Sequence, residues 1–223
     1  MRGLFLTLEG PDGAGKTTQG TRLVEYLRRA GLSVVSTREP GGTAIGERIR
    51  QLLLDETYRE MAPVTEMLLF AASRAQFVRE VVEPALAKGV TVLSERYVDA
   101  SLAYQGYGRG IDVALVRQVN EVATGGLLPD LTLLLDIDPA VGLERARTAG
   151  GKEGVAGRGD RLEQETLAFY ERVRAGFLQL ARESPQRIVV IDAQGDVERV
   201  HRRVIEAVQG LLAGRKMAPE SPE

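Results

Sequence analysis

The stretch GPDGAGKTT, from Gly10 to Thr18, carries residue types that can hold the phosphates of a nucleotide. It fits the pattern G-x-x-x-x-G-K-[ST], in which glycines let the backbone turn tightly and point its N–H groups at phosphate oxygens. The apolar run Leu4–Leu8 predicts a strand before it, and a helix is predicted from Gly15 onward, with a partial positive charge at its N-terminus. Lys16 can reach the terminal phosphates, and the Thr17 hydroxyl can bind Mg²⁺. This stretch therefore predicts a site for a nucleoside triphosphate.

The sequence after this loop argues against two classes of nucleotide-binding protein. A GTPase switch needs a late Asn-Lys-x-Asp motif, but Asn120, in VNEV, is the only asparagine in the chain. A motor or transport ATPase normally has a hydrophobic strand that ends in Asp-Glu, whereas TVLSER ends in Glu95 and Arg96. An arginine at this strand end suits a second bound phosphate.

Arginines and aromatic residues gather in four short motifs. These motifs are TREPGG at Thr37–Gly42, FAASR at Phe70–Arg74, ERY at Glu95–Tyr97 and SLAYQGYGRG at Ser101–Gly110. Arg38 and Arg96 follow predicted strands, and the carboxyl ends of parallel strands face the ligand crevice. We therefore expect both arginines to share a crevice with Lys16, where they favour a second anionic group beside the triphosphate.

Phe70 and Arg74 lie one helical turn apart and so share a helix face. A ring for stacking and a guanidinium for a carbonyl edge suit a flat base. Other interpretations stay open: Phe70 as a core residue, Arg74 as a solvated surface charge. Tyr104 and Tyr107 either belong to the same site or pack within their loop.

Composition limits the remaining possibilities. The chain has 223 residues, no cysteine and a net charge of −2, which exclude disulfides and thiol catalysis and give no basic surface for nucleic acid. The only histidine, His201, lies in the charged helical pattern VERVHRRVIEAV and is expected on a surface helix, so histidine catalysis is nearly excluded. No apolar run has membrane-spanning length, and the chain enters a predicted strand at once. We therefore expect a cytoplasmic protein with neither membrane nor nucleic acid as a partner.

Short apolar runs alternate with amphipathic segments, which predicts a parallel sheet with helices on both faces. The predicted strands are Leu4–Leu8, Ser33–Ser36, Val90–Leu93, Leu131–Asp136 and Arg187–Ile191. The predicted helices are Gly15–Ala30, Ile45–Leu54, Val64–Ala87, Val113–Thr124, Ala140–Thr148, Leu162–Glu183 and Val197–Leu212.

Two segments break this alternation. Thr148–Asp160 has five glycines and four charged residues, so it is predicted to be a mobile loop or lid. Gly214–Glu223 is polar and contains proline, which predicts a flexible tail. Residues 1–213 are expected to form a single domain with the lid at about residues 148–160.

The motifs GPDGAGKTT, TREPGG, FAASR, ERY and AYQGYGRG, in this order and spacing, resemble those of the bacterial thymidylate kinase family. The resemblance covers Leu4 to Leu212. It implies an α/β fold of the P-loop NTP hydrolase type, with a five-stranded parallel sheet and a lid segment. It also implies an enzyme of dTTP synthesis that phosphorylates dTMP to dTDP with ATP and Mg²⁺, and that usually forms a homodimer.

The resemblance assigns the acceptor-binding residues by position. Asp12 matches a carboxylate that contacts the sugar 3′-hydroxyl, and Arg38 and Arg96 match arginines near the acceptor phosphate. Phe70 matches the ring that stacks on thymine, and Arg74 matches the contact to a thymine carbonyl. The remaining matches are Ser101 and Gln105, near the base, and Tyr104, which crowds the sugar 2′ carbon.

The resemblance also implies the ATP, metal and catalytic residues. The ATP-binding residues are Gly10, Asp12, Gly13, Ala14, Gly15, Lys16, Thr17, Thr18 and Arg145, and adenine is expected near Arg145 and the loop after Ile191. The metal site is expected at Thr17, Glu9 and Glu95, although the family usually has aspartate where Glu95 stands. The catalytic residues are Lys16, Arg96, Arg158 and Arg147.

The last two of these arginines rest on a departure at Ala14. One branch of the family has a basic residue at this position, and where it is missing the transition-state arginine lies in the lid. Arg158 is the first choice for that arginine and Arg147 the second. For Arg161 a structural role, pairing within its own segment, is an equal alternative.

Two alternatives remain beside this interpretation. The chain can be another nucleoside monophosphate kinase or a deoxynucleoside kinase, which rates with dTMP, dUMP, dCMP and thymidine would separate. It can also be a nucleotide-dependent regulator or ATPase, which would hydrolyse ATP without an acceptor and would not bind dTMP.

Overall fold

A computed structural model describes residues 2–150, 161–162 and 164–217 of the chain. Five parallel strands form one sheet in the order β2-β3-β1-β4-β5. The strands are β1 (Phe5–Glu9), β2 (Val34–Arg38), β3 (Thr91–Glu95), β4 (Leu131–Asp136) and β5 (Ile188–Asp192). The predicted five-stranded parallel sheet is confirmed. Four strands end one or two residues later than predicted, because the backbone ladder continues past the apolar run into a charged residue.

The helices follow the predicted segments closely. They are α1 (Lys16–Arg29), α2 (Ala44–Leu54), α3 (Pro63–Phe77), α4 (Glu83–Ala87), α5 (Val98–Ser101), α6 (Val113–Thr124), α7 (Pro139–Gly150), α8 (Leu167–Glu183) and α9 (Val197–Met217). A 3₁₀ turn, Glu56–Tyr58, follows α2, and π-helical turns at Val78–Val82 and Leu102–Gly108 extend α3 and α5.

Two helix boundaries differ from the prediction by more than two residues. Helix α8 begins at Leu167 rather than Leu162, because the Thr166 side chain accepts a hydrogen bond from the Phe169 N–H and caps the helix. Helix α9 runs to Met217, so residues 214–217 of the predicted tail are helical, and the segment has no proline before position 219 to stop the helix. Residues 218–223 of the predicted tail lie outside the described residues, so the proposed division into domain and tail stays a prediction. The short α5 and its π-helical extension were not predicted, since neither has a full period of apolar residues.

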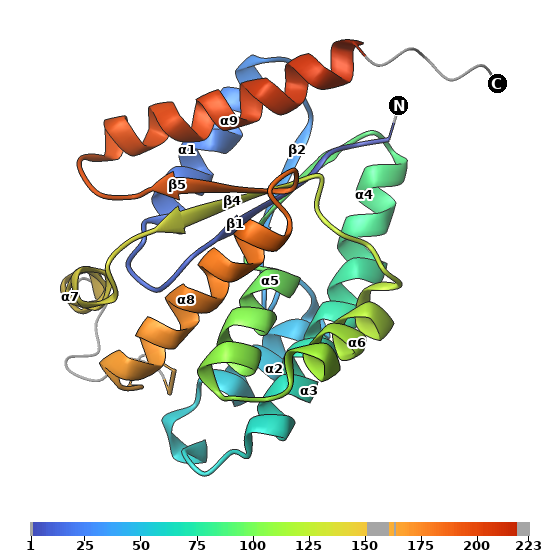
Figure 1. Cartoon of the computed structure of the whole chain (residues 1–223). Helices are drawn as coiled ribbons and strands as arrows, with labels where there is room; N and C mark the ends of the chain where they lie inside the picture. The colour runs from blue at the N-terminus through green and yellow to red at the C-terminus, as the bar shows by residue number, and fades with distance from the viewer. Residues whose placement is uncertain (1, 151–160, 163, 218–223) are drawn as a thin grey trace.

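Helices cover both faces of the sheet (Figure 1). On one face, Leu6 of β1 packs in a core with Leu23 of α1 and Val204 of α9. On the other, Phe5 packs with Phe77 of α3, in a layer that also includes α4, α6 and α8. The alternation of neighbouring residues between the two cores explains why the strands are almost continuously apolar. No helix in the described part of the chain combines the length and the apolar character needed to span a membrane.

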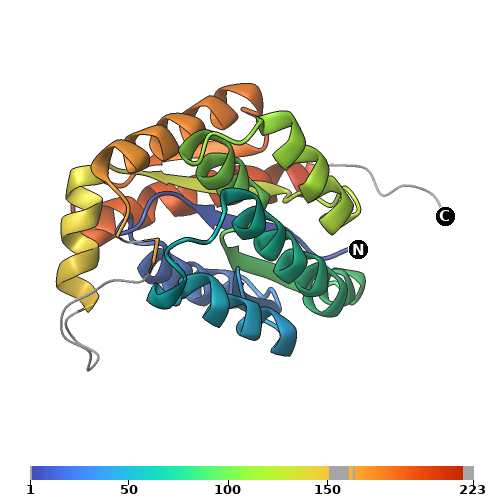
Figure 2. The same ribbon diagram turned by 90° about the horizontal axis from the view of Figure 1, so that it is seen from below.

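The carboxyl ends of the three strands β1, β2 and β3 lie in register. Glu95 of β3 pairs with Arg38 of β2 on one side and with Leu8 of β1 on the other. The turn that follows β1 and the Arg96 backbone therefore leave the sheet at the same edge. In the view of Figure 2, α7 lies at one end of the molecule and the α2–α3 pair lies below the sheet. The fold thus brings the sequence motifs to one edge of the sheet.

Candidate active site

The loop between β1 and α1 has the backbone that its glycines predict. Gly13 and Gly15 have φ values of 72° and 91°, in the left-handed region that favours glycine, and Gly15 is the N-cap of α1. A Cβ on Gly13 would lie 1.9 Å from the carbonyl oxygen of Gly142 in α7, and a Cβ on Gly142 would lie 2.5 Å from the carbonyl oxygen of Asp12. At Gly13 and Gly142, α7 therefore packs on the loop through close contact between backbone atoms.

Lys16 lies over this loop. Its Nζ donates to the carbonyl oxygens of Gly10 and Pro11 at 3.0 and 2.8 Å, and lies 3.9 Å from Oδ1 of Asp12. Burial lowers the pKa of Lys16 to about 8, and the positive charge of Arg96 acts in the same direction. An added anion would oppose both effects, so this ammonium is suited to a phosphate.

Asp12 is surrounded by one guanidinium and two phenols. Arg96, at the end of β3, donates to Asp12 and to the Tyr104 hydroxyl, and its guanidinium carbon lies 4.8 Å from the centre of the Tyr104 ring. The hydroxyls of Tyr104 and Tyr170 lie 3.2 Å from Oδ2 of Asp12. Burial raises the pKa of Asp12, but the charges of Arg96 and Lys16 outweigh it and lower the pKa overall. Asp12 is therefore an ionised acceptor.

Arg74 is buried, with 1% of its surface exposed, so it is not the solvated surface charge of the alternative interpretation. Its Nε donates to Glu39 at 2.7 Å, and Nη1 donates to Ser101 at 2.9 Å and to Asn120. One Nη2 N–H donates to the Tyr97 carbonyl at 3.0 Å. These contacts use four of the five guanidinium N–H groups and fix the plane of Arg74.

Thr17 and Glu95 form the candidate metal site. The Thr17 hydroxyl donates to Oε2 of Glu95 at 2.9 Å, and both residues line the cavity. Glu9, the third residue predicted for this site, does not line the cavity, and its metal role stays a prediction. It is fully buried, and its Oε1 accepts from the N–H groups of Tyr97 at 2.7 Å and Ala100 at 3.3 Å. Burial, followed by repulsion from the neighbouring acid Asp99, raises the pKa of Glu9 to about 8.

A single cavity of about 930 Å³ connects these groups. Of the predicted binding residues, those that line it are Asp12, Gly13, Ala14, Gly15, Lys16, Thr17, Thr18, Arg38, Phe70, Arg74, Glu95, Arg96, Ser101, Tyr104, Gln105 and Arg145. Phe70 is 8% exposed, so it is a core residue of α3 with one edge on the cavity. Arg145 also lines the cavity and donates to the Ala193 carbonyl at 3.4 Å. Other lining residues from this region are Gly195, in the loop after β5, and Val197, at the start of α9.

A model of the thymidylate kinase family matches residues 8–204 of the chain. The chain belongs to this family. It is 52% identical over 206 residues to the thymidylate kinase of Desulfosudis oleivorans, covering 92% of this chain and 96% of that one. It is 54% identical over 207 residues to the thymidylate kinase of Deinococcus radiodurans, covering 93% and 97%. The crystal structure of thymidylate kinase from Ehrlichia chaffeensis superposes with a TM-score of 0.74 at 35% identity, covering 94% of this chain and 99% of that one.

Membership of the thymidylate kinase family confirms the predicted fold class and the predicted kinase activity. The alternatives of a regulator or an unrelated ATPase are thereby excluded. The roles assigned to individual residues stay predictions.

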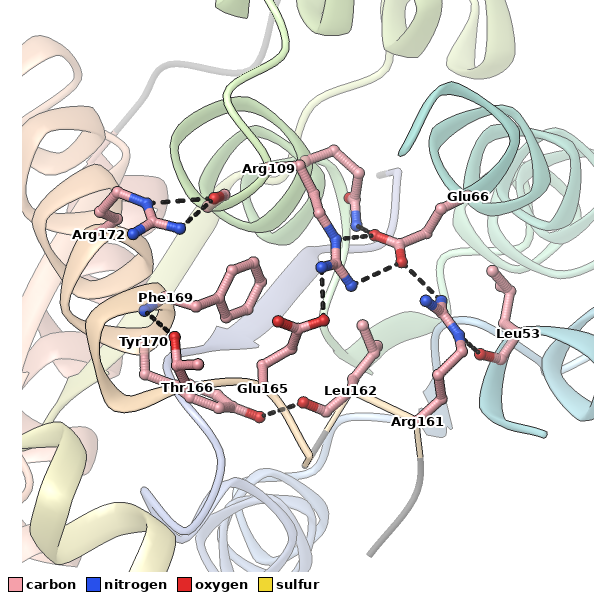
Figure 3. Close-up of polar contacts among 12 residues, drawn as sticks. Leu53, Glu66, Arg109, Arg161, Leu162, Glu165, Thr166, Phe169, Tyr170 and Arg172 are labelled. Carbon is pink, nitrogen blue, oxygen red and sulfur yellow. Dashed lines mark hydrogen bonds and ion pairs between the residues drawn. The ribbon is translucent and has the colours of Figure 1, made fainter. Parts of the chain in front are cut away.

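The arginines near the lid differ in position. Arg147, in the last turn of α7, is exposed and is not among the residues that line the cavity, and Arg158 lies outside the described residues. Arg161 has a structural position: it donates to Oε2 of Glu66 at 2.6 Å and to the Leu53 carbonyl at 2.9 Å (Figure 3). Among the described residues, its side-chain partners belong to α3 and α2, whereas the prediction placed them in its own segment.

Several site residues were not predicted from the sequence. Glu39 and Pro40 line the cavity within the TREPGG motif, which singled out only their neighbour Arg38. Tyr170 comes from α8, where the sequence predicted only the helix Leu162–Glu183. Tyr107, which was grouped with the aromatic residues of the site, instead packs its ring against Gly176 of α8 and does not line the cavity.

Proposed function

We propose that this chain transfers the γ-phosphoryl group of ATP to the 5′-phosphate of dTMP, releasing dTDP and ADP, in dTTP synthesis. One observation carries the assignment of both substrates to one site. One cavity is lined both by the phosphate loop, with Lys16, and by Arg38, Arg96 and Phe70. Such a cavity suits two nucleotides placed end to end, with their phosphates meeting between the two basic groups.

ATP occupies the end built by the loop and α7 in this proposal. The loop N–H groups, the N-terminus of α1 and Lys16 bind its phosphates. The adenine lies between Arg145 and the loop after β5, because these segments close the cavity on that side.

dTMP occupies the opposite end. Arg38 and Arg96 bind its phosphate, and Asp12 accepts a hydrogen bond from its 3′-hydroxyl. The Tyr104 ring packs between Arg96 and Phe169 of α8. In this proposal it crowds the sugar 2′ carbon and so favours deoxyribose. Phe70 stacks on the base, and Arg74 donates to a base carbonyl with its one remaining N–H group.

The acceptor oxygen is already a phosphate anion, so the reaction needs no strong general base. This agrees with the place of His201, which bonds to Gln19 between α1 and α9. The chain's contribution is alignment and the neutralisation of charge on a loose, in-line transition state by Lys16 and Arg96, with Arg158 or Arg147 as the lid arginine.

A divalent cation, Mg²⁺, fits the chemistry of Thr17 and Glu95. Both offer oxygen ligands 2.9 Å apart on the cavity wall, next to the phosphate loop. The described residues contain no cluster of three or more histidine, cysteine or acidic side chains, and Mg²⁺ bound with nucleotide phosphates needs only one or two protein ligands. When bound, the ion would neutralise charge on the β- and γ-phosphates.

The test is ADP release measured with dTMP, dUMP, dCMP, thymidine and no acceptor. We expect dTMP to give the highest kcat/KM and the reaction without acceptor to be slow, because the second anionic group completes the site. Highest activity on thymidine would identify a deoxynucleoside kinase instead, and rapid hydrolysis without any acceptor would contradict the proposal. The cytoplasmic location expected from the composition stays a prediction.

We further propose that the chain forms a homodimer through α3 and α6. These helices pack side by side (Figure 1). Both expose apolar residues: Leu68 on α3, and Leu115 and Val122 on α6. Val122 is 87% exposed, and it lies two helical turns from Leu115 on the same face. Such a stripe is typical of a surface that is covered by a partner.

Sedimentation tests the dimer. The wild-type chain is expected at twice its 24.2 kDa mass, and Val122→Glu is expected to shift it toward the monomer by placing a charge in the interface. Val190→Glu, at an exposed apolar position on β5, is the matched control and should leave the mass unchanged. A monomeric wild-type chain at micromolar concentration would refute the dimer.

A further inference from the structure

Glu66 of α3 is a buried carboxylate with four hydrogen bonds. Its Oε1 accepts from Nε2 of Gln105 at 2.9 Å and from Nε of Arg109 at 3.1 Å. Its Oε2 accepts from Arg109 at 3.0 Å and from Arg161 at 2.6 Å, so two guanidinium groups flank one carboxylate (Figure 3). Burial raises the pKa of Glu66, but the hydrogen bonds from Arg109 and the other donors outweigh it and lower the pKa overall. Glu66 is therefore ionised, and it can only accept hydrogen bonds.

This charge decides how the Gln105 amide is oriented. An amide has a donor end and an acceptor end, and only the donor end can face an ionised carboxylate. Nε2 of Gln105 is therefore held toward Glu66. Gln105 also lines the cavity, beside Arg74 and Ser101, so its carbonyl oxygen Oε1 is the amide atom left for a ligand.

The base end of the cavity thus presents a donor and an acceptor. Arg74 supplies the donor. Four of its five guanidinium N–H groups donate within the protein, and the fifth is left for a ligand. Gln105 supplies the acceptor through Oε1. Thymine has the complementary edge, with the O4 acceptor next to the N3–H donor. Cytosine has the reverse edge, with an amino donor at C4 and an acceptor at N3.

We propose that Glu66 is a positioning residue for pyrimidine specificity: it holds the Gln105 amide with its oxygen toward the base, so that a base with N3–H is accepted and cytosine is rejected. The proposal rests on the proposed function, in which dTMP occupies this end of the cavity. It goes beyond the binding residues themselves, because Glu66 does not line the cavity and acts through Gln105.

The same carboxylate fixes the chain that leads into α8. Arg161 reaches Glu66 through Nη2, while its Nε donates to the Leu53 carbonyl at 2.9 Å and its backbone N–H donates to the Leu54 carbonyl at 3.2 Å. Glu66 therefore links the residue that reads the base to the segment that closes the cavity at Leu162. A purely structural role would predict that loss of Glu66 harms all substrates equally.

The variant Glu66→Gln separates the two roles. The new amide should place its oxygen toward Arg109 and Arg161 at the Oε2 position, which receives two guanidinium N–H groups. Its NH₂ group would then replace Oε1, the acceptor for Gln105 and for the Arg109 Nε–H. Arg109 keeps its bond to the other position, while the Gln105 amide must turn over and present Nε2 to the cavity. We expect the ratio of kcat/KM for dTMP over dCMP to fall by about 10- to 100-fold, since a favourable contact becomes a clash of two donors.

The substrate dUMP is the internal control. Uracil has the same O4 and N3–H edge as thymine and differs only by the 5-methyl group, so the ratio of dTMP over dUMP should stay within about twofold of its wild-type value. Asp99→Asn is the matched control variant. Asp99 is also a buried carboxylate, held by Arg187 at 2.6 and 2.8 Å, but it does not line the cavity. This variant should leave both ratios unchanged.

A double variant keeps the test decisive if Glu66→Gln folds poorly. Glu66→Gln combined with Gln105→Glu exchanges the amide and the carboxylate, so the network retains its charge. One oxygen of the new carboxylate accepts from the new amide, and the other presents an acceptor to the base. We expect the preference for dTMP over dCMP to return.

The outcomes are distinct. A fall in the dTMP to dCMP ratio with a constant dTMP to dUMP ratio, or recovery of the preference in the double variant, supports the proposal. Equal losses on all three substrates in Glu66→Gln, or a double variant without preference, would overturn it. A wild-type enzyme with no dTMP activity would instead refute the proposed function, independently of Glu66.

Discussion

Replacing Lys16 with methionine is expected to lower kcat by about 10²- to 10⁴-fold, the scale for losing one electrostatic contact to a transferred phosphoryl group. Methionine keeps most of the length and the apolar stem but removes the ammonium that the loop carbonyls of Gly10 and Pro11 hold in place. Because this charge interacts most strongly with the transition state, the effect should fall on kcat more than on KM for ATP. ADP release at saturating ATP and dTMP measures it.

Lys88→Met is the matched control, since Lys88 is exposed after α4, at the edge of the sheet opposite the cavity. It should leave kcat within about twofold of the wild-type value, as is usual for surface substitutions. Circular dichroism and thermal unfolding of both variants check that they are folded. Normal turnover by Lys16→Met would remove the role assigned to this lysine.

Replacing Arg96 with methionine is expected to reduce kcat/KM for dTMP by about 10²- to 10⁴-fold, because a partly buried charge that binds an anion is lost. The KM for ATP should change far less, because Arg96 lies at the acceptor end of the phosphate loop. Removal of Arg96 also removes the charge that most lowers the pKa of Asp12, so this pKa should rise. Steady-state rates over a range of dTMP and of ATP separate these effects.

The variant Arg96→Lys refines this expectation. Lysine restores the positive charge but not the fork that donates to Asp12 and Tyr104 together, so it should recover only part of the lost activity. Arg117→Met, at an exposed arginine paired with Glu183, controls for the loss of a surface charge. Equal activity in Arg96→Met and Arg117→Met would show that Arg96 does not bind the acceptor.

The phosphate loop and the strand ends could be predicted from the sequence because both depend on short-range patterns. Glycine spacing fixes the loop, and apolar runs fix the strands, so Lys16, Arg38 and Arg96 were expected at one edge of the sheet and lie there. The position of Arg74 in the site was also expected. Its burial was not, because its partners Glu39 and Asn120 lie 35 and 46 residues away in the chain.

The contacts of Glu9 could not be predicted in this way. The resemblance to the family implies a place near the metal for this residue, and that role stays a prediction. Its side chain accepts hydrogen bonds from the first turns after β3, which depend on the four-residue helix α5. A helix this short has no apolar periodicity, and the contact could not be foreseen. Tyr170 was missed for a related reason: it faces Asp12 only once α8 is docked.

The contact of Gly142 with Asp12 and Gly13 has a consequence for motion during the reaction. At Gly142 the backbone of α7 packs directly on the backbone of the phosphate loop, with no side chain between them. No side chain can therefore change its rotamer at this point to accommodate a displacement. If the loop shifts when a triphosphate binds, α7 must move with it as a rigid body. Arg145 and Arg147, which lie on later turns of α7, would then move as well. Binding of a triphosphate at the loop would in this way be coupled to the positions of the two arginines that α7 carries.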